Sequence, residues 1–372
     1  MIRSLVAALT LIAVPAAAIP PAPPTTTNPA DRPLIAWLPG PVRCAGEVAN
    51  PVTMRRPLTA LGWNGMTAAP APVVVRFAID AAGRPVSIAR AEQISAVMAQ
   101  DIEPSLAASR FAAGAPRQGC EVRYTLRITP MDATPVEDLA SYTVAPDSGP
   151  LPQAGWDRLH PAGSTCFDPP RPQPLVRVLP EFGTLPATPG VRDWTLVGYD
   201  LDARGRPIEV RTVHGTGNRV LDAAGIKATR ASRFTAGART GCRYPYWRAP
   251  ATLAAPEGPD PETLRPAGAT CPDEGGAWTT PPRLSYPEPW RRRGIEGWAI
   301  VAFDVAPWGE PGNLRILASE PAEAFGQQAE QVIRAGRKAA APQGRSGCIE
   351  RVRFLMPPRG AAETGPAEMP ID

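Results

Sequence analysis

Six cysteines constrain the fold of this chain more than any other feature of the sequence. Taken in order as pairs, they are separated by 76, 76 and 77 residues. Six cysteines allow 15 pairings in general, but near-identical spacing is typical of a tandem repeat with one pair in each copy. The spacing therefore predicts three sequential disulfides, which are Cys44–Cys120, Cys166–Cys242 and Cys271–Cys348.

The first 18 residues have the pattern of a secretory signal peptide. Arg3 supplies the positive start, Leu5 to Val14 is apolar, and Ala16 to Ala18 offers a small-residue cleavage site. The apolar stretch is shorter than the roughly 20 residues that a spanning helix needs. We expect a mature protein that begins at Ile19 and lies in the periplasm, where disulfides form. The alternative is that this segment is retained as an inner-membrane anchor that faces the periplasm.

Short phrases repeat at fixed distances from the cysteines. The second cysteine of each pair ends the four-residue phrase Arg-x-Gly-Cys, and Cys166 and Cys271 end the similar phrases HPAGSTC and RPAGATC. A glycine follows the first cysteine of each pair by 39, 39 and 38 residues, and these glycines are Gly83, Gly205 and Gly309. Matching features at matching offsets predict three copies of one domain.

Each copy is expected to form a hairpin, a helix and a final strand. An apolar run precedes the glycine and a second run follows it, which is the pattern of a hairpin whose turn needs a glycine at positive φ. The first strands are expected at Val73–Asp80, Trp194–Asp202 and Trp298–Val305, and the second at Pro85–Ala91, Pro207–Val213 and Asn313–Ala318. In the third copy Phe325, Ala329, Val332 and Ile333 share one helix face, with Ser319 as a candidate N-cap.

The last strand of each copy begins at its second cysteine and alternates apolar with polar residues. Val352, Phe354 and Met356 alternate with Arg351 and Arg353 in the third copy, which indicates a sheet with one face in the core. The predicted fold class is α+β, with three tandem domains that each hold a three-stranded antiparallel sheet and one main helix. Domains this small are marginally stable alone, and each disulfide is expected to stabilise its domain by about 4 kcal/mol.

The repeat also sets the expected domain boundaries. The 49 prolines favour linkers and loops between short domains. The expected segments are a signal peptide at 1–18, a Pro-rich arm at 19–33, repeat 1 at 34–130, a linker at 131–160, repeat 2 at 161–249, a linker at 250–265, repeat 3 at 266–356 and a disordered tail at 357–372.

The sequence lacks the residue combinations that catalysis or metal binding needs. It has only two histidines, His160 and His214, no Walker-type phosphate loop and no GxSxG elbow. The cysteines are assigned to disulfides, so a zinc site would lack ligands. The formal net charge is only +4, and no basic run indicates nucleic acid. We therefore expect no enzyme activity, no catalytic residues, no metal or cofactor, and no small-molecule or nucleic-acid partner.

The third copy resembles the C-terminal domain of the TonB family. Tyr286-Pro287 is followed by the phrase Gly-Ile-Glu-Gly at 294–297, a strand, a turn glycine, a second strand, an amphipathic helix and a last strand. Residues 283–356 fit this pattern. The first two copies share only the hairpin, the helix and the last strand, because they lack the Tyr-Pro and Gly-Ile-Glu-Gly phrases.

The resemblance implies a function in binding. The family domain receives a peptide of an outer-membrane receptor as an added β-strand, which requires an open sheet edge rather than special side chains. The implied function is a non-enzymatic periplasmic binding or adaptor protein whose partners are envelope proteins, including outer-membrane receptor peptides. The alternative is a membrane-anchored TonB-type energy transducer for outer-membrane transport. The implied partner-binding residues are Tyr286, Pro287, Arg351, Val352 and Arg353.

Overall fold

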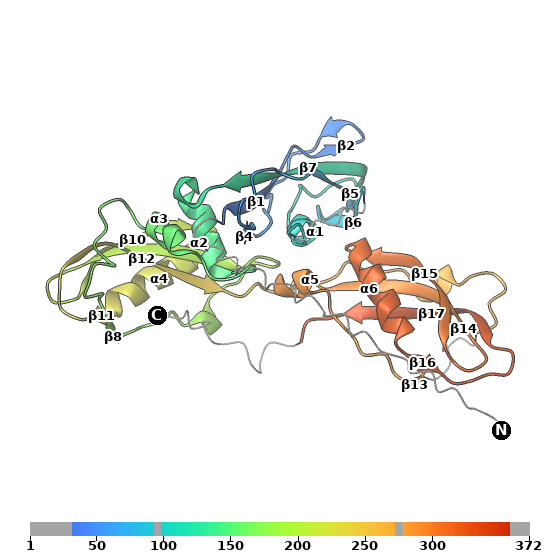
Figure 1. Ribbon diagram of the computed structural model, residues 1–372. Coiled ribbons are helices and arrows are strands. Elements are labelled where there is room, and N and C mark those ends of the chain that lie inside the picture. Colours follow the sequence, from blue (N-terminus) through green and yellow to red (C-terminus); the bar gives the residue numbers. More distant parts are fainter. Residues whose placement is uncertain (1–31, 93–97, 272–277, 358–372) are drawn as a thin grey trace, which may run out of the picture.

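A computed structural model describes residues 32–92, 98–271 and 278–357. Within them the chain is a mixed α+β protein of several small antiparallel sheets and few helices, as predicted (Figure 1). The expected signal peptide, all but the end of the expected arm, and residues 358–372 of the expected tail lie outside the described residues. None of the described helices is long and apolar enough to cross a membrane. The three predicted disulfides are all present.

Repeat 1 is built on a hairpin and a long last strand. Its sheet has seven strands rather than the predicted three, because the chain before and after Cys44 adds strands to it. The predicted helix is short, and residues 93–97 before it are outside the described residues. The elements are β1 (Leu34–Pro39), β2 (Arg43–Cys44), β3 (Glu47–Val48), β4 (Ala60–Leu61), β5 (Val73–Ile79), β6 (Pro85–Arg90), α1 (Ile102–Ala107) and β7 (Arg117–Thr129).

Repeats 2 and 3 have the predicted three-stranded sheets, in the orders β10-β9-β12 and β15-β14-β17. In repeat 2 the elements are β8 (Pro174–Val176), η3 (Phe182–Thr184), β9 (Asp193–Leu201), β10 (Pro207–Gly215), α4 (Arg219–Ala231), β11 (Arg233–Phe234) and β12 (Arg239–Arg248). In repeat 3 they are β13 (Trp278–Thr280), α5 (Glu288–Arg292), β14 (Gly297–Val305), β15 (Pro311–Glu320), α6 (Glu323–Arg334), β16 (Arg337–Lys338) and β17 (Arg345–Phe354).

The main helix of repeat 3 packs as its periodicity predicts. Phe325, Ala329, Val332 and Ile333 are all buried against the sheet. The prediction that Ser319 caps this helix is wrong. Strand β15 extends to Glu320, and the N-cap position is Ala322, which has an extended backbone and no side-chain acceptor.

The two segments expected to be linkers are folded against the sheets. Residues 131–160 form η2 (Met131–Ala133), α2 (Val136–Val144) and α3 (Gln153–Leu159). Leu139 and Tyr142 of α2 are buried with Trp194 and Leu196, on the face of the repeat 2 sheet that α4 does not cover. These residues form helices because apolar positions recur at helical spacing, a signal that the prolines around them obscure.

The segment 250–265 covers repeat 3 in the same way. It contains η4 (Pro261–Leu264), and Ala255 and Leu264 pack on Trp298, Ile300 and Ile349. The indole N–H of Trp298 donates to the Pro256 carbonyl at 2.7 Å. The sheets of repeats 2 and 3 are therefore covered on both faces, by their own helix and by the segment that precedes them.

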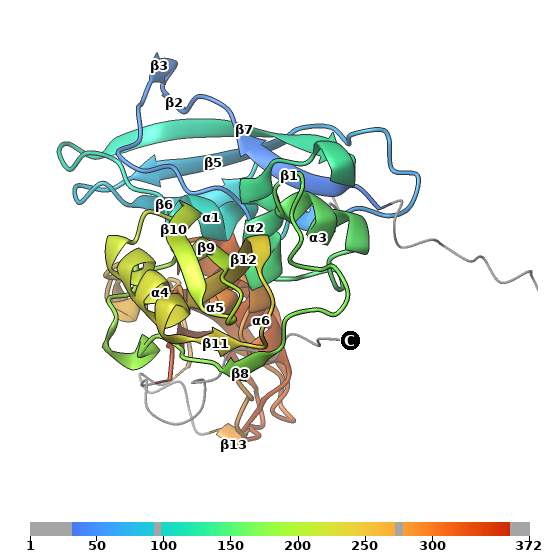
Figure 2. The same cartoon turned by 90° about the vertical axis from the view of Figure 1, so that its left-hand side faces the viewer.

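Buried contacts between the repeats hold them in one arrangement (Figures 1 and 2). The Arg293 guanidinium of repeat 3 pairs with the Asp101 carboxylate of repeat 1, with Nε 2.6 Å from Oδ1. It also donates to the carbonyls of Arg56 and Gly190. Ile88 of repeat 1 donates its N–H to the Pro321 carbonyl of repeat 3 at 2.9 Å. Arg293 thus reaches all three parts of the chain from within a buried site.

The repeated turn glycine meets two requirements at once. Gly83, Gly205 and Gly309 have φ values of 76°, 73° and 94°, a region that favours glycine. A Cβ atom on any of them would also lie 2.1 or 2.2 Å from the carbonyl oxygen of a residue three or four positions after the helix. The hairpin turn therefore closes onto the chain after the helix, and only glycine leaves room.

We predict that Gly205→Ala will destabilise the protein more than Gly217→Ala. Both positions have positive φ, but nothing lies within 4 Å of a Cβ on Gly217, whereas the Phe234 oxygen would lie 2.2 Å from one on Gly205. The expected losses in free energy of unfolding are about 1 kcal/mol for Gly217→Ala and about 3 kcal/mol for Gly205→Ala. Denaturant unfolding with the disulfides intact measures both. Equal losses would contradict the close-approach explanation.

Candidate peptide-binding edge

The candidate site is one edge of the last strand in each repeat. Strands β7, β12 and β17 each pair along one edge with the first hairpin strand, β5, β9 or β14. We call the opposite edge the outer edge. The disulfide brings the chain around the first cysteine to the start of this outer edge. β2 pairs with β7 at Cys44 and Cys120, and the Thr165 and Thr270 N–H groups donate to the carbonyls of Thr240 and Ser346.

Repeat 1 fills its outer edge with its own chain. Strand β1 lies antiparallel to β7, with Pro39 opposite Tyr124 and Leu34 opposite Thr129. The Gly40 N–H donates to the Arg123 carbonyl at 2.8 Å. Because successive residues of an antiparallel strand direct their backbone groups to opposite edges, this bond shows that Arg123, the third residue after Cys120, faces the outer edge.

In repeat 2, the matching outward position of the last strand is a proline, which has no backbone N–H to donate. Pro245 is the third residue after Cys242, as Arg123 is after Cys120. The register between β12 and β9 is continuous from Cys242 to Arg248, across this proline. Proline has no N–H and is tolerated in a sheet where that group would face away from the ladder. Pro245 therefore leaves the outer edge of β12 without a donor at its middle.

Repeat 3 leaves the outer edge open. The described chain before Cys271 forms η4, which packs on one face of β17 without pairing with its edge, so no strand there corresponds to β1. Arg351 is the third residue after Cys348 and so faces outward. The Met356 N–H donates to the Glu296 carboxylate, just before β14, at 2.9 Å, which agrees with Val352 facing β14. Among the described residues, none outside β14 forms a backbone hydrogen bond with Ile349, Arg351 or Arg353.

The side chains of the predicted partner-binding residues in β17 point to both faces of the sheet. Val352 is buried against α6. Arg351 lies on the other face, where its guanidinium donates to the Pro259 carbonyl and lies 5.8 Å from the centre of the Trp298 ring. Arg353 shares the Arg351 face and is exposed. The structure thus places Arg351 and Arg353 on one face of the open edge and Val352 in the core.

Tyr286 and Pro287 lie at the end of the sheet. The Tyr286 hydroxyl donates to the Ile295 carbonyl at 2.5 Å and lies 3.3 Å from the Phe354 carbonyl. Its ring packs edge-on against Phe325 and Phe354, and burial raises the pKa of its hydroxyl. Pro287 occupies the N-cap of α5. These two residues brace the end of β14 and β17 and contribute no backbone group to the open edge.

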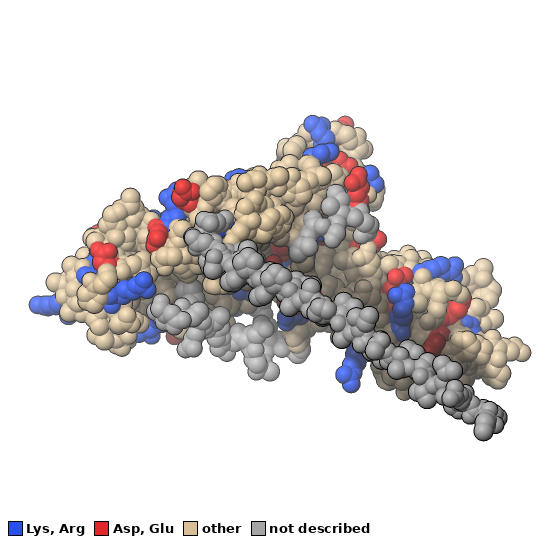
Figure 3. Space-filling model, viewed as in Figure 1, with Lys and Arg blue, Asp and Glu red and all other residues tan. Residues whose placement is uncertain are grey.

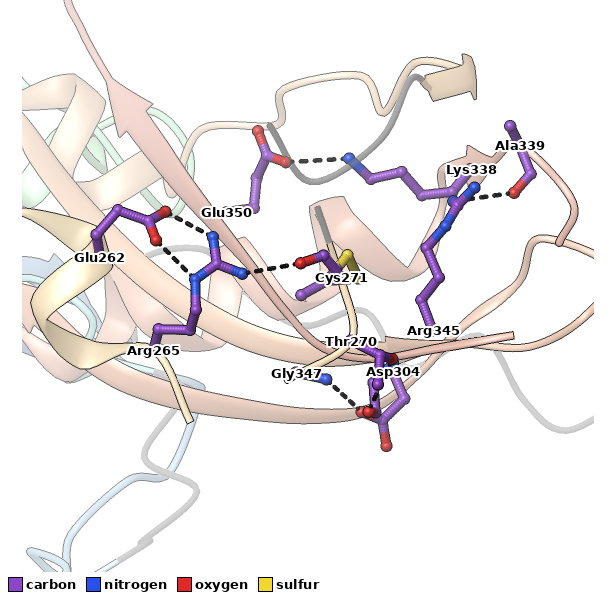
Figure 4. Close-up of a disulfide and its surroundings, with 12 residues drawn as sticks. Glu262, Arg265, Thr270, Cys271, Asp304, Lys338, Ala339, Arg345, Gly347 and Glu350 are labelled. Atoms are coloured by element: carbon purple, nitrogen blue, oxygen red, sulfur yellow. Dashed lines mark hydrogen bonds and ion pairs between the residues drawn. A yellow bond between two sulfur atoms is a disulfide. The ribbon is translucent and has the colours of Figure 1, made fainter. Parts of the chain in front are cut away.

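A charged pair lies on the α6 face of β17. Lys338 is buried, with its Nζ atom 4.0 Å from the centre of the Trp278 ring and 3.3 Å from the Glu350 carboxylate (Figure 4). Burial lowers the pKa of the Lys338 ammonium. Repeats 1 and 2 have Phe111 and Phe234 at this position. The aliphatic stem and the aromatic contact let a lysine take the place of phenylalanine, while Glu350 balances its charge.

The remaining candidate groups have structural roles. The buried His160 ring packs edge-on against Phe167, and its Nδ1 atom lies 2.7 Å from the Trp156 carbonyl. Burial lowers the pKa of this imidazole. No group of three or more His, Cys, Asp or Glu side chains suited to a metal ion occurs in the described part of the chain. On the face drawn in Figure 3, basic and acidic side chains are interspersed over the described residues.

Sequence reasoning missed Pro245 and β1. A proline in the middle of the predicted last strand of repeat 2 is visible once the copies are aligned on their second cysteines. The apolar run of β1, LIAWLP, reads as a strand, but nothing local shows that its partner is β7. Such features are found by comparing the repeats with one another, not by searching each repeat for a motif.

Repeat 3 is a three-stranded α+β domain whose last strand has an open edge. Residues 282–355 match the family model of the Gram-negative bacterial TonB protein C-terminal domain. The match includes α5, β14, β15, α6, β16 and the whole of β17, so the predicted resemblance of the third copy is confirmed. No curated protein matches the chain.

We predict opposite outcomes for proline at two adjacent positions of β17. Val352→Pro removes a donor to β14 and should reduce the free energy of unfolding by about 3 kcal/mol or more. Arg351→Pro copies the backbone arrangement at Pro245 and should cost less than Val352→Pro, because it removes only the Arg351 side-chain contacts with Pro259 and Trp298 and no bond to β14. Thermal and denaturant unfolding of the full chain, with disulfides intact, compare the two. If Arg351→Pro is the more damaging variant, the assigned backbone directions are wrong.

Proposed function

We propose that this chain is a non-enzymatic periplasmic binding or adaptor protein that engages envelope proteins by β-strand addition at the outer edge of β17. The observation that carries the proposal is the open backbone of Ile349, Arg351 and Arg353. A strand added to such an edge gains affinity from main-chain hydrogen bonds. The match of this domain to the TonB C-terminal family supports a protein partner in the cell envelope.

Comparison of the three repeats supports a single binding edge. β1 covers the equivalent edge of repeat 1, and Pro245 interrupts that of repeat 2. Repeats 1 and 2 then serve as a scaffold, which holds repeat 3 through Arg293 and the contacts at Pro321. The protein therefore binds one partner segment per chain.

Site-specific photo-crosslinking tests this function. A photoreactive amino acid at position 353, in the full-length exported protein, should crosslink to an envelope protein in intact cells. The same amino acid at position 125 is the matched control, because Thr125 is the fifth residue after Cys120 as Arg353 is after Cys348, and β1 lies alongside it. Position 125 should give no such product.

The variant Arg351→Pro then tests whether the crosslink at position 353 depends on the outer edge of β17. It removes one outward donor and should abolish or strongly reduce the product at position 353. Arg337→Ala, which changes an exposed arginine paired with Glu310 away from this edge, should leave it unchanged. A product that persists at full yield in Arg351→Pro, or equal products at 125 and 353, would exclude strand addition at β17.

A further inference from the structure

In repeats 2 and 3, an aspartate carboxylate bonds the glycine of the Arg-x-Gly-Cys phrase. The Gly241 N–H donates to Asp200 Oδ1 at 2.7 Å, and the Gly347 N–H donates to Asp304 Oδ1 at 2.9 Å (Figure 4). Each aspartate is the fifth residue before the turn glycine of its hairpin. Hydrogen bonds from the Asn313 amide and the Gly347 N–H lower the pKa of the Asp304 carboxyl, because donors favour the ionised form. This glycine N–H is thus placed to bind a carboxylate.

Repeat 1 has the glycine but not the carboxylate. Ala78 is the fifth residue before Gly83, where the other repeats have aspartate. The φ of Gly119 is 60°, close to the 73° and 66° of the other two phrases, and Phe77 lies opposite Cys120 in the register that repeats 2 and 3 share. The Gly119 N–H therefore points to the same side of the sheet. Among the described residues outside β5, it has no acceptor.

A hollow opens where the carboxylate is missing. It has a volume of about 340 Å³, at the lower end of the range of small-ligand sites, roughly 300–1,000 Å³. Ser87 gives its N–H and its hydroxyl to the Glu320 carboxylate, so the donors left in the hollow are the Gly119 N–H and the Arg76 guanidinium. The lining residues are Arg76, Phe77, Ala78, Ser87, Gln118, Gly119, Cys120 and Glu121.

Repeat 1 also lacks the segment that covers this place in the other repeats. A Cβ atom on Gly241 would lie 2.8 Å from Pro161, and one on Gly347 would lie 2.7 Å from Ala269. Pro161 and Ala269 belong to the phrases HPAGSTC and RPAGATC. Nothing lies within 4 Å of a Cβ on Gly119. The hollow in repeat 1 is therefore accessible to a molecule from outside the chain.

The charges beside the hollow favour an anion. Phe77 packs in the core with α1, so Arg76 and Ala78, its neighbours in β5, face away from α1. Glu121 of β7 lies opposite both Arg76 and Arg43 in the neighbouring strands, and these three side chains sum to one positive charge. Arg76 is exposed, and no hydrogen bond or ion pair joins it to another described residue.

We propose that this hollow in repeat 1 is a carboxylate-binding site, in which an acid from outside the chain takes the place of the aspartate of repeats 2 and 3. The carboxylate accepts the Gly119 N–H and pairs with Arg76, and such charge-assisted hydrogen bonds are stronger than neutral ones. Since one water molecule takes about 30 Å³ in the liquid, the hollow has room for atoms beyond the carboxylate. The site lies on repeat 1 and does not depend on the proposed function of β17.

Acetate tests the site in the full chain with isotope-labelled glycine. The amide proton of Gly119 should shift downfield and saturate as sodium acetate is added, and it should not respond to sodium chloride at equal ionic strength. Gly241 and Gly347 are internal controls, because Asp200 and Asp304 already accept their N–H groups. A Gly119 amide that does not move, or equal shifts of all three glycines, would overturn the proposal.

Two substitutions connect this shift to the hollow. Ala78→Asp supplies the missing carboxylate, so the Gly119 amide should lie downfield without acetate and no longer respond to it. Arg76→Gln changes an exposed side chain and should weaken acetate binding about two- to fivefold, the range of one exposed ion pair. Arg337→Gln, at an exposed arginine of repeat 3, should leave it unchanged. Wild-type acetate affinity in Arg76→Gln, or in folded Ala78→Asp, would contradict the assignment.

Larger probes distinguish a free acid from the side chain of a protein. Succinate represents the first source, and the tripeptide Ala-Glu-Ala, capped at both ends, represents the second. Tighter binding of succinate than of acetate and the peptide supports a small acid as the ligand, whereas tightest binding of the peptide supports an acidic side chain. Ala78→Asp should abolish the Gly119 response to either probe. If no carboxylate shifts Gly119 in the wild-type chain, the proposal is wrong.

Discussion

The covalent link between the start of each repeat and the start of its last strand is the constraint on which this structure depends. Each disulfide fixes the chain around the first cysteine beside the last strand, with Cα–Cα distances of 3.8, 5.1 and 5.0 Å. The backbone hydrogen bonds at Thr165 and Thr270 follow from it. Because the preceding segment is held there, its conformation decides whether the outer edge is covered. A strand covers β7, whereas helices precede the cysteines of repeats 2 and 3.

The three repeats are also joined more closely than three domains on flexible linkers would be. α2 and the segment 250–265 fill the second faces of the sheets of repeats 2 and 3. Arg293 then pairs with Asp101 where only 7% of the arginine side chain is exposed. Removing one member of a buried ion pair leaves the other charge unpaired and costs several kcal/mol, so this pair favours one arrangement of the repeats. Arg293, which directly precedes the Gly-Ile-Glu-Gly phrase, thus has an architectural role in this chain.

Much of this fold could be predicted from the sequence because its signals are local or periodic. The cysteine spacing predicted the disulfides, and the positions of Gly83, Gly205 and Gly309 predicted the hairpins. The burial of Phe325 and Ile333 follows from helical periodicity. The additional strands of repeat 1 and the packed helix α2 could not be predicted in this way, because they depend on contacts between segments far apart. β1 pairs with β7 across about ninety residues of intervening chain, and no local propensity encodes such a pairing. Likewise, the sequence indicated the last strand of the third copy as the candidate edge, but the pairing of β1 with β7 and the outward position of Pro245 in β12 required the structure.

An open strand edge is also a risk, since identical edges can pair with one another and aggregate. The edge of β17 is short, because Thr270 pairs with its start and the strand ends at Phe354. Its charges add a second protection. An antiparallel pairing of two copies centred on Arg351 would place that residue opposite its own counterpart, with Arg353 nearby on the same face, and like charges directly opposite are destabilising. These side chains therefore oppose self-association, while the outward backbone groups of the same edge stay open.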